Sequence, residues 1–351
     1  MTEFVNGSGD LLEAPVDALV NTVNTVGIMG KGIALQFKRA FPANFAAYAK
    51  ACRRGEVALG EMFVYDNGLE RPRWIVNFPT KGHWRSQSRL TDIDHGLGDL
   101  ARVIEECDIT SVALPPLGCG NGGLDWRDVE PLIRRRLAGL SVVVHLFAPG
   151  VAPTAAAMRV ATTSPELTES RAALLTLLHR YSQRAGDVSL VETQKLMYFL
   201  QVAGQQLRLN FEKGRYGPYA DALRHVLIRL EGHYLEGYGD GSKRVQESEP
   251  IRLLDGAADQ AAATLRTLAD NAVIDRIERT LDLTHGFESP YGMELLATVH
   301  WCASDPAIGS ASDATACVRT WSDRKARMFT DGHVDAAWAH LESLGWLHQS
   351  L

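Results

Sequence analysis

The chain of 351 residues lacks several features that would mark a specialised class of protein. It has no apolar run near the roughly 20 residues of a membrane-spanning helix, and its first residues resemble no secretory signal. We therefore expect a cytoplasmic protein without membrane contact. Five cysteines without a CxxC pair favour neither a disulfide framework nor a zinc site. The metal-ligand types His285, Glu288, His300 and Cys302 have no paired spacing, so we expect no metal and no other cofactor.

An excess of positive charge is also missing. The 36 Lys and Arg residues are outnumbered by 42 Asp and Glu, and residues 1–150 carry 16 basic and 17 acidic side chains. Neutralisation of phosphates supplies most of the affinity in nonspecific nucleic-acid binding. Neither half of the chain is therefore expected to bind DNA tightly and nonspecifically, although a single nucleotide can still enter a pocket.

The length and composition indicate two globular domains. Hydrophobic residues make up 46% and charged residues 22% of the chain, and a domain holds about 100 to 200 residues. Residues 148–165 are rich in Ala, Thr and Pro and show no periodicity, so we expect them to contain the linker. The predicted domains are residues 1–155 and 156–351.

The first domain alternates short β-branched runs with helical patterns, which is typical of an α/β layer fold. We expect a mixed sheet covered by helices on both faces. The predicted helices lie near 33–41, 92–106 and 127–140, and the predicted strands are 17–21, 62–65, 74–77, 111–114 and 142–147.

The second domain is expected to be mainly α-helical, because its leucines repeat at helical spacing from residue 174 onward. Tyr198 and Phe199 share the spacing of neighbouring leucines, which predicts core positions. Residues 334–347 predict a helix stopped by Gly345 and followed by a short apolar strand, as at the end of a winged-helix-like fold.

A first glycine-rich segment, with Gly27, Gly30 and Gly32, follows the strand at 17–21 and precedes a helix. Unhindered backbone N–H groups at such a turn suit a phosphate, although neither the P-loop nor the dinucleotide-binding pattern is present. The carboxamides of Asn21 and Asn24 offer donors and acceptors to sugar hydroxyls, and their alternative role is to cap the turn. Two such residues beside a glycine loop favour contact with a ribose.

A second glycine-rich segment, residues 118–123, has four glycines in six residues and suits a pyrophosphate with its adjoining ribose. Asp125 invites a catalytic interpretation, but its spacing to Asp128 before a helix favours a cap. No His or basic neighbour in sequence would lower the pKa of Cys119, so we expect a packing residue rather than a nucleophile.

Lys81 lies just after the strand at 74–77, near the same edge of the sheet as the glycine loops. An amine there suits a phosphate counter-charge, a general acid or a nucleophile toward a sugar aldehyde. From the residues alone, an ordinary surface ion pair is the favoured role.

Four ordered blocks resemble the macrodomain of the DarG family, the DNA ADP-ribosyl glycohydrolase antitoxins of DarT/DarG toxin–antitoxin systems. The blocks are GDLL, VNTVNTVGIMGKGIALQFK, NFPTK and LPPLGCGNGGLDW, and the resemblance covers residues 1 to about 152. The resemblance implies a three-layer α/β/α macrodomain that binds ADP-ribose. It also implies removal of ADP-ribose from thymine bases of single-stranded DNA, which reverses the modification made by the toxin.

The resemblance further implies roles for single residues. Lys81 becomes the catalytic lysine, Asp10 and Leu11 lie at the adenine end, and Asn21 and Asn24 surround the distal ribose, while both glycine loops contact the diphosphate. The implied substrate-binding residues are Gly9, Asp10, Leu11, Asn21, Thr22, Val23, Asn24, Gly30, Lys31, Gly32, Ile33, Ala34, Thr80, Gly118, Cys119, Gly120, Asn121, Gly122 and Gly123.

Two departures separate the chain from other macrodomain hydrolases. The human terminal ADP-ribose protein glycohydrolase has an aspartate where Gly122 stands here, so the resemblance supplies no acid to assist Lys81. Lys31 interrupts the longer glycine run of the deacetylase-like branch. The lysine is expected to act either as a cation beside the departing base or as a Schiff-base nucleophile.

The second domain resembles, more loosely, helical antitoxin modules with a KLxYF…YGP pattern, here at residues 195–199 and 216–218. In DarG proteins the carboxyl-terminal region binds DarT, which implies a toxin-binding domain. Two alternatives stay open. One is a module that reads ADP-ribose without hydrolysis and neutralises a toxin only by protein contact, and the other is a hydrolase of free ADP-ribose esters.

Overall fold

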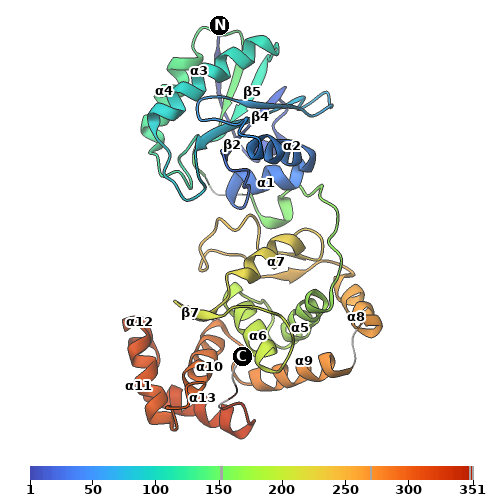
Figure 1. The fold of residues 1–351 in the computed structure, drawn as a ribbon, viewed down its shortest axis with the longest axis vertical. Coiled ribbons are helices and arrows are strands. Elements are labelled where there is room, and N and C mark those ends of the chain that lie inside the picture. Colours follow the sequence, from blue (N-terminus) through green and yellow to red (C-terminus); the bar gives the residue numbers. More distant parts are fainter. Residues whose placement is uncertain (151–152, 269–270, 348, 350–351) are drawn as a thin grey trace. The chain divides into compact units, whose positions relative to one another are not determined.

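The computed structural model in Figure 1 describes residues 1–150, 153–268, 271–347 and 349. It contains two compact units: Met1–Thr163 with Asp240–Ser242, and Ser164–Gly239 with Lys243–Leu351. Residues 151 and 152 of the expected linker lie outside the described residues. The part of the linker that follows them forms a short 3-10 helix, η2 (Ala155–Ala157), and then buries Met158.

The first unit is built on a six-stranded mixed sheet with the order β1-β6-β5-β2-β4-β3. All neighbouring strands are parallel except β3 and β4. The strands are β1 (Glu3–Asn6), β2 (Ala18–Asn24), β3 (Phe63–Asp66), β4 (Trp74–Lys81), β5 (Ser111–Leu114) and β6 (Val143–Leu146). Five of them were predicted from the sequence, and the sixth is the short edge strand β1.

Alternation along the strands divides the apolar side chains between two faces. Leu19, Ile75 and Ala113 pack with α1 (Gly32–Ala40), and Tyr48 and Ala51 of α2 (Pro42–Arg53) pack against the end of β2. Val20, Val76 and Val112 pack with α3 (Leu90–Glu106) and α4 (Trp126–Leu137) on the other face. Figure 1 shows these two helical layers around the sheet, so the expected three-layer α/β/α fold is confirmed.

Parallel pairing fixes where the site lies. Because β2, β4 and β5 run in the same direction, their carboxyl ends meet at one edge of the sheet. The first glycine-rich segment leaves β2, Lys81 ends β4, and the second glycine-rich segment follows β5. A short 3-10 helix, η1 (Leu11–Glu13), precedes β2.

The second unit is mainly helical, as predicted, and Tyr198 and Phe199 are buried in its single core. Its helices are α5 (Glu169–Ala185), α6 (Leu190–Val202), α7 (Ala222–Leu230), α8 (Ala257–Leu268), α9 (Asn271–Thr284), α10 (Pro290–Ala303), α11 (Ala311–Trp321), α12 (Asp323–Met328) and α13 (Asp331–Ser343). Two strand pairs accompany them: β7 (Glu212–Gly214) with β8 (Gly217–Tyr219), and β9 (Leu235–Glu236) with β10 (Arg252–Leu253). No described helix is long and apolar enough to cross a membrane.

The end of the second unit differs from the expected winged-helix-like arrangement. The helix α13 stops near Gly345, which has a φ of 68°, but the described residues after it form no strand. The left-handed turn at Gly345 instead directs Trp346 into the core, where its ring meets Phe199. Packing of one large ring replaces the predicted strand.

A disulfide joins Cys302 of α10 to Cys317 of α11, with Cα atoms 6.1 Å apart. The expectation that the cysteines form no disulfide is therefore wrong. The two residues are 15 positions apart in the sequence, and only the packing of α10 against α11 brings them together. Such a contact between helices leaves no local spacing pattern.

Candidate functional site

Three predicted segments converge on Asn121. The Nζ atom of Lys81 donates a hydrogen bond to the backbone oxygen of Asn121 at 2.8 Å. A Cβ atom placed on Gly32 would lie 3.5 Å from Nδ2 of the same asparagine. Lys81 is also the Cα partner of Asn24 in the pairing of β4 with β2. The lysine, the end of β2 and both glycine loops therefore form one site.

Lys81 does not make the surface ion pair that its residue type alone favoured. Its side chain is half-buried, and within the described ranges no carboxylate pairs with it. Burial lowers the pKa of Lys81 from its ordinary value, because the ammonium loses part of its hydration. The remaining contact with solvent still stabilises the charged form.

Asn24 braces the turn that follows β2. Its Oδ1 accepts from the backbone N–H groups of Val26 at 3.0 Å and Ile28 at 3.3 Å, and its Nδ2 donates to the Ile28 oxygen at 2.6 Å. The Tyr48 hydroxyl of α2 donates to the backbone oxygen of Asn24. The capping role is thus present in the structure, and contact of Asn24 with a ribose stays a prediction.

Asn21 lies in the interior of the unit. Its Nδ2 donates to Oδ1 of Asn77 at 3.0 Å, and Nδ2 of Asn77 donates to Oδ1 of Asn44 at 2.7 Å. All three side chains are fully buried, and this chain of amides joins β2, β4 and α2. Its geometry makes Asn21 a support for the strand ends, and the ribose contact of this residue also stays a prediction.

The second glycine loop has three crowded positions and one open position. Gly118 and Gly123 have φ values of 71° and 78°, and a Cβ on Gly122 would collide with Gly118 O and Ser88 Oγ. An acidic side chain therefore cannot take the place of Gly122 without rearrangement. By contrast, a Cβ on Gly120 would meet nothing within 4 Å.

Cys119 has the properties of a packing residue, as expected. It packs against the core formed by the sheet with α3 and α4, and burial raises its pKa to about 11. A thiol with a raised pKa holds little thiolate at neutral pH and is a poor nucleophile.

Two aspartates at the site act as caps. Oδ1 of Asp125 accepts from the backbone N–H of Arg127 at 2.9 Å, and its pairing with the Arg127 side chain lowers the pKa of Asp125 to about 2. The predicted cap at the start of α4 is thereby confirmed. Asp10 caps η1 in the same way, through the N–H of Leu12 at 2.9 Å.

The segment 82–89, which follows Lys81, also borders the site, although it is absent from the expected set. Thr25 donates to the Gly82 oxygen, and the N–H of Ser88 donates to the Gly122 oxygen at 2.9 Å. One signal in the sequence was available. Five Lys and Arg residues and no Asp or Glu occur between Glu70 and Asp92, and Trp84 and Arg85 are adjacent.

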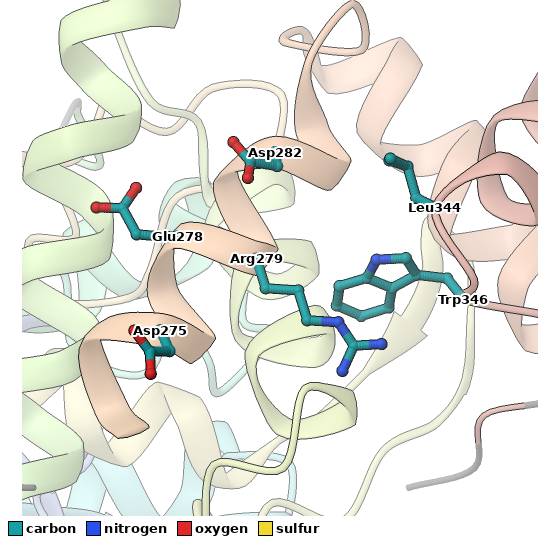
Figure 2. Close-up of a pocket in the computed structure, with 6 residues that line it drawn as sticks. All are labelled: Asp275, Glu278, Arg279, Asp282, Leu344 and Trp346. Carbon is teal, nitrogen blue, oxygen red and sulfur yellow. The ribbon is translucent and has the colours of Figure 1, made fainter. Parts of the chain in front are cut away.

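A separate pocket of about 300 Å³ lies in the second unit, and no predicted site residue lines it. In Figure 2, Arg279 of α9 extends along the ring of Trp346, 4.6 Å from the ring centroid. The other lining residues are Asp275, Glu278, Asp282 and Leu344. Elsewhere in the unit His300 contacts the Tyr198 hydroxyl, and Cys302 is in the disulfide. No cluster suited to a metal occurs among the residues that the structure describes.

Comparisons with known proteins give a consistent result. The family model for the macro domain matches residues 20–133. Two proteins named DNA ADP-ribosyl glycohydrolase are similar over nearly the whole chain. The Thermus aquaticus protein is 48% identical over 341 residues, covering 96% of this chain and 92% of its own length. The Mycobacterium tuberculosis protein is 46% identical over 345 residues, covering 94% and 97%.

A third relative matches part of the chain. It is a fusion protein of Thermosipho africanus named DNA ADP-ribosyl transferase-DNA ADP-ribosyl glycohydrolase. It is 34% identical over 157 residues, which cover 40% of this chain and 40% of the fusion protein.

The cap at Asp125 gives a first testable prediction. Replacing Asp125 by Ala should destabilise the start of α4, because the Arg127 N–H loses its acceptor. Hydrogen exchange of the first-turn amides of α4 should become about fivefold faster. Asp125→Asn keeps an acceptor oxygen and should exchange at nearly the native rate. Equal exchange in Asp125→Ala and the native chain would show that the cap contributes nothing.

Proposed function

The chain belongs to the DNA ADP-ribosyl glycohydrolase family, and we propose that its macrodomain hydrolyses the N-glycosidic bond between ADP-ribose and thymine bases of single-stranded DNA. Similarity to the glycohydrolases of Thermus aquaticus and Mycobacterium tuberculosis over both units supports this activity. The observation that carries the proposal is the position of Lys81. Its Nζ, 2.8 Å from the Asn121 oxygen, stands where the β2 end and both glycine loops meet.

We place ADP-ribose along this edge of the sheet. The diphosphate lies against Gly30–Ala34 and Gly118–Gly123, where glycine lets backbone N–H groups approach it closely. Gly120, the open position, faces that ligand. The distal ribose lies beside Asn24 and Lys81, which are paired across β2 and β4, and the adenine lies toward Asp10.

The chemistry requires stabilisation of charge on the departing base. Cleavage of a ribosyl bond passes through a state with oxocarbenium character, and the imide of thymine leaves as a resonance-stabilised anion. The Lys81 ammonium stabilises that anion or gives it a proton. No carboxylate pairs with Lys81 in the described ranges, and Gly122 leaves no room for one in the loop. Lys81 therefore acts as a cation without an acidic partner.

Removal of the amine is the direct test of the catalytic residue. Lys81→Ala should keep the fold, because the side chain is outside the core clusters, and should lower turnover by about 100-fold or more. The measurement is the rate at which thymine-ADP-ribosylated oligonucleotide returns to its unmodified mass. Lys50→Ala, an exposed lysine on α2, is the matched control and should turn over at the native rate. Near-native turnover by Lys81→Ala would exclude this lysine from catalysis.

The charge state of Lys81 predicts the pH dependence. The cation is lost as pH rises through the pKa of Lys81, which burial places below its ordinary value. The rate should therefore fall on the alkaline side, and the midpoint of that fall should lie below the pKa of a free lysine. Lys81→Ala should lack this limb in its residual activity. A rate that rises over the same range, with a borohydride-trapped adduct on Lys81, would establish the Schiff-base mechanism instead.

Gly120 tests the location of the diphosphate. Gly120→Val should leave the fold intact, because a Cβ at this position meets nothing within 4 Å and the backbone is outside the left-handed region. The added atoms should obstruct the phosphates and abolish ADP-ribose binding in calorimetry. Gly98→Val on the exposed face of α3 adds the same side chain away from the site and should bind normally. Unchanged affinity of Gly120→Val would remove the diphosphate from this loop.

We further propose that the second unit binds and inhibits a DarT-type DNA ADP-ribosyltransferase toxin. The Thermosipho africanus fusion protein is named for a transferase and a glycohydrolase in one chain, which associates the two activities. Its match covers 40% of this chain. Residues 151–351 carry 20 basic and 25 acidic side chains, including three carboxylates on α9 around the pocket in Figure 2. This acidic excess suits the DNA-binding groove of a toxin.

The two activities should separate between the two units, because each has its own hydrophobic core. Residues 1–163, which hold all of the first unit except Asp240–Ser242, should hydrolyse modified DNA without retaining the toxin. Residues 164–351 should retain the toxin without hydrolysis. The full chain with Lys81→Ala should still protect cells from the toxin, but only in proportion to the amount of antitoxin present. The reason is that an inhibitor acts once per toxin molecule, whereas a hydrolase turns over. Co-purification of each fragment with the toxin measures this. Retention by the first fragment, or none by the second, would contradict the division.

A further inference from the structure

The connection between β4 and α3, residues 82–89, is held at both ends by the candidate site. At its start, the backbone N–H and the hydroxyl of Thr25 donate to the Gly82 oxygen at 3.3 and 2.8 Å. At its end, the Ser88 N–H donates to the Gly122 oxygen of the second glycine loop. Residues 83–87 between these anchors are exposed. We call residues 82–89 the 82–89 loop.

The 82–89 loop presents a stacked group of rings and a cation to solvent. Trp84 is 44% exposed, although tryptophan is a large side chain that proteins usually cover. The Arg85 guanidinium lies over the Trp84 ring, 4.4 Å from its centroid. The centroid of the His83 ring lies 5.2 Å from that of the Trp84 ring. These contacts leave a large part of the Trp84 ring exposed.

The charge around this group differs from that of the rest of the chain. Acidic residues outnumber basic ones overall, yet the sequence between Glu70 and Asp92 has five Lys and Arg residues and no acid. Three of these cations, Lys81, Arg85 and Arg89, lie at the end of β4 or in the 82–89 loop. An exposed aromatic ring among cations is the combination that binds single-stranded nucleic acid, by stacking on bases and pairing with phosphates.

We propose that the 82–89 loop binds the DNA strand beside the modified thymine. Trp84 stacks on a neighbouring base, and Arg85 and Arg89 contact the adjoining phosphates. This inference rests on the proposed function, which places the glycosidic bond at Lys81, and the loop begins at the next residue. Stacking accepts any base, so the contact favours modified DNA over free ADP-ribosyl nucleoside without setting a sequence preference.

The test compares two substrates that differ only in the strand. One is an oligonucleotide with a central ADP-ribosylated thymine, and the other is ADP-ribosyl thymidine. The readout is the ratio of kcat/KM on the oligonucleotide to kcat/KM on the nucleoside. Trp84→Ala should lower this ratio about tenfold, as loss of one stacked base does. Trp84→Phe should restore most of it, because a ring remains.

Matched controls come from the opposite end of β4. Leu69 is 48% exposed in the turn before that strand, and Leu69→Ala should leave the ratio at the native value. The Arg73 guanidinium lies 4.6 Å over the Trp74 ring, so Arg73→Ala is the control for Arg85→Ala. For the oligonucleotide, Arg85→Ala should reduce the slope of log kcat/KM against the logarithm of the salt concentration by about 0.7. This is the value expected for the loss of one phosphate contact to a single strand.

The outcomes separate this inference from the proposed function. If the native chain cleaves both substrates and Trp84→Ala leaves the ratio unchanged, the DNA contact is wrong and the proposed function stands. An equal loss on both substrates would also overturn it, because Trp84 would then serve ADP-ribose or the fold. If the native chain cleaves neither substrate, the proposed function itself fails. Circular dichroism of each variant confirms that it has folded.

Discussion

The parallel pairing of β2 with β4 determines the position of the whole candidate site. The register places Asn21 opposite Asn77, and an irregularity between Val23 and Asn24 then places Asn24 opposite Lys81. Hydrogen bonds among the buried amides of Asn21, Asn77 and Asn44 tie the strands to α2, and each bond contributes about 1 kcal/mol. These bonds connect the carboxyl-terminal halves of β2 and β4 to α2. A lysine on a fixed strand end needs no movement to reach the Asn121 loop.

Much of this arrangement could be predicted from the sequence because it depends on local patterns. Short β-branched runs identified five strands, and the glycine runs identified both loops. The edge strand β1 and the helix α2 were missed for different reasons. The first is only four residues long, and the second is rich in alanine and buries Asn44 and Tyr48, so neither shows a clear amphipathic pattern. The Cys302–Cys317 disulfide and the inward turn of Trp346 depend on helix packing and have no local signal.

The side-chain roles at the site needed the structure. From the sequence, Asn21 and Asn24 were interchangeable candidates for a ribose, yet one lies in a buried amide chain and the other braces a turn. The crowding at Gly122 gives a physical reason for the missing acid, since the Ser88 side chain fills the space that a carboxylate would need. The resemblance to a family supplied the role of Lys81, and the hydrogen bond to Asn121 supplies its geometry.

The most direct measurement is the mass of a defined oligonucleotide, ADP-ribosylated on one thymine, after incubation with a substoichiometric amount of the native chain. Hydrolysis at the Lys81 site should return the strand to its unmodified mass and release free ADP-ribose in equal amount, over many turnovers. A strand that keeps its full modified mass, although the protein binds ADP-ribose in calorimetry, would show that this macrodomain reads the modification without removing it.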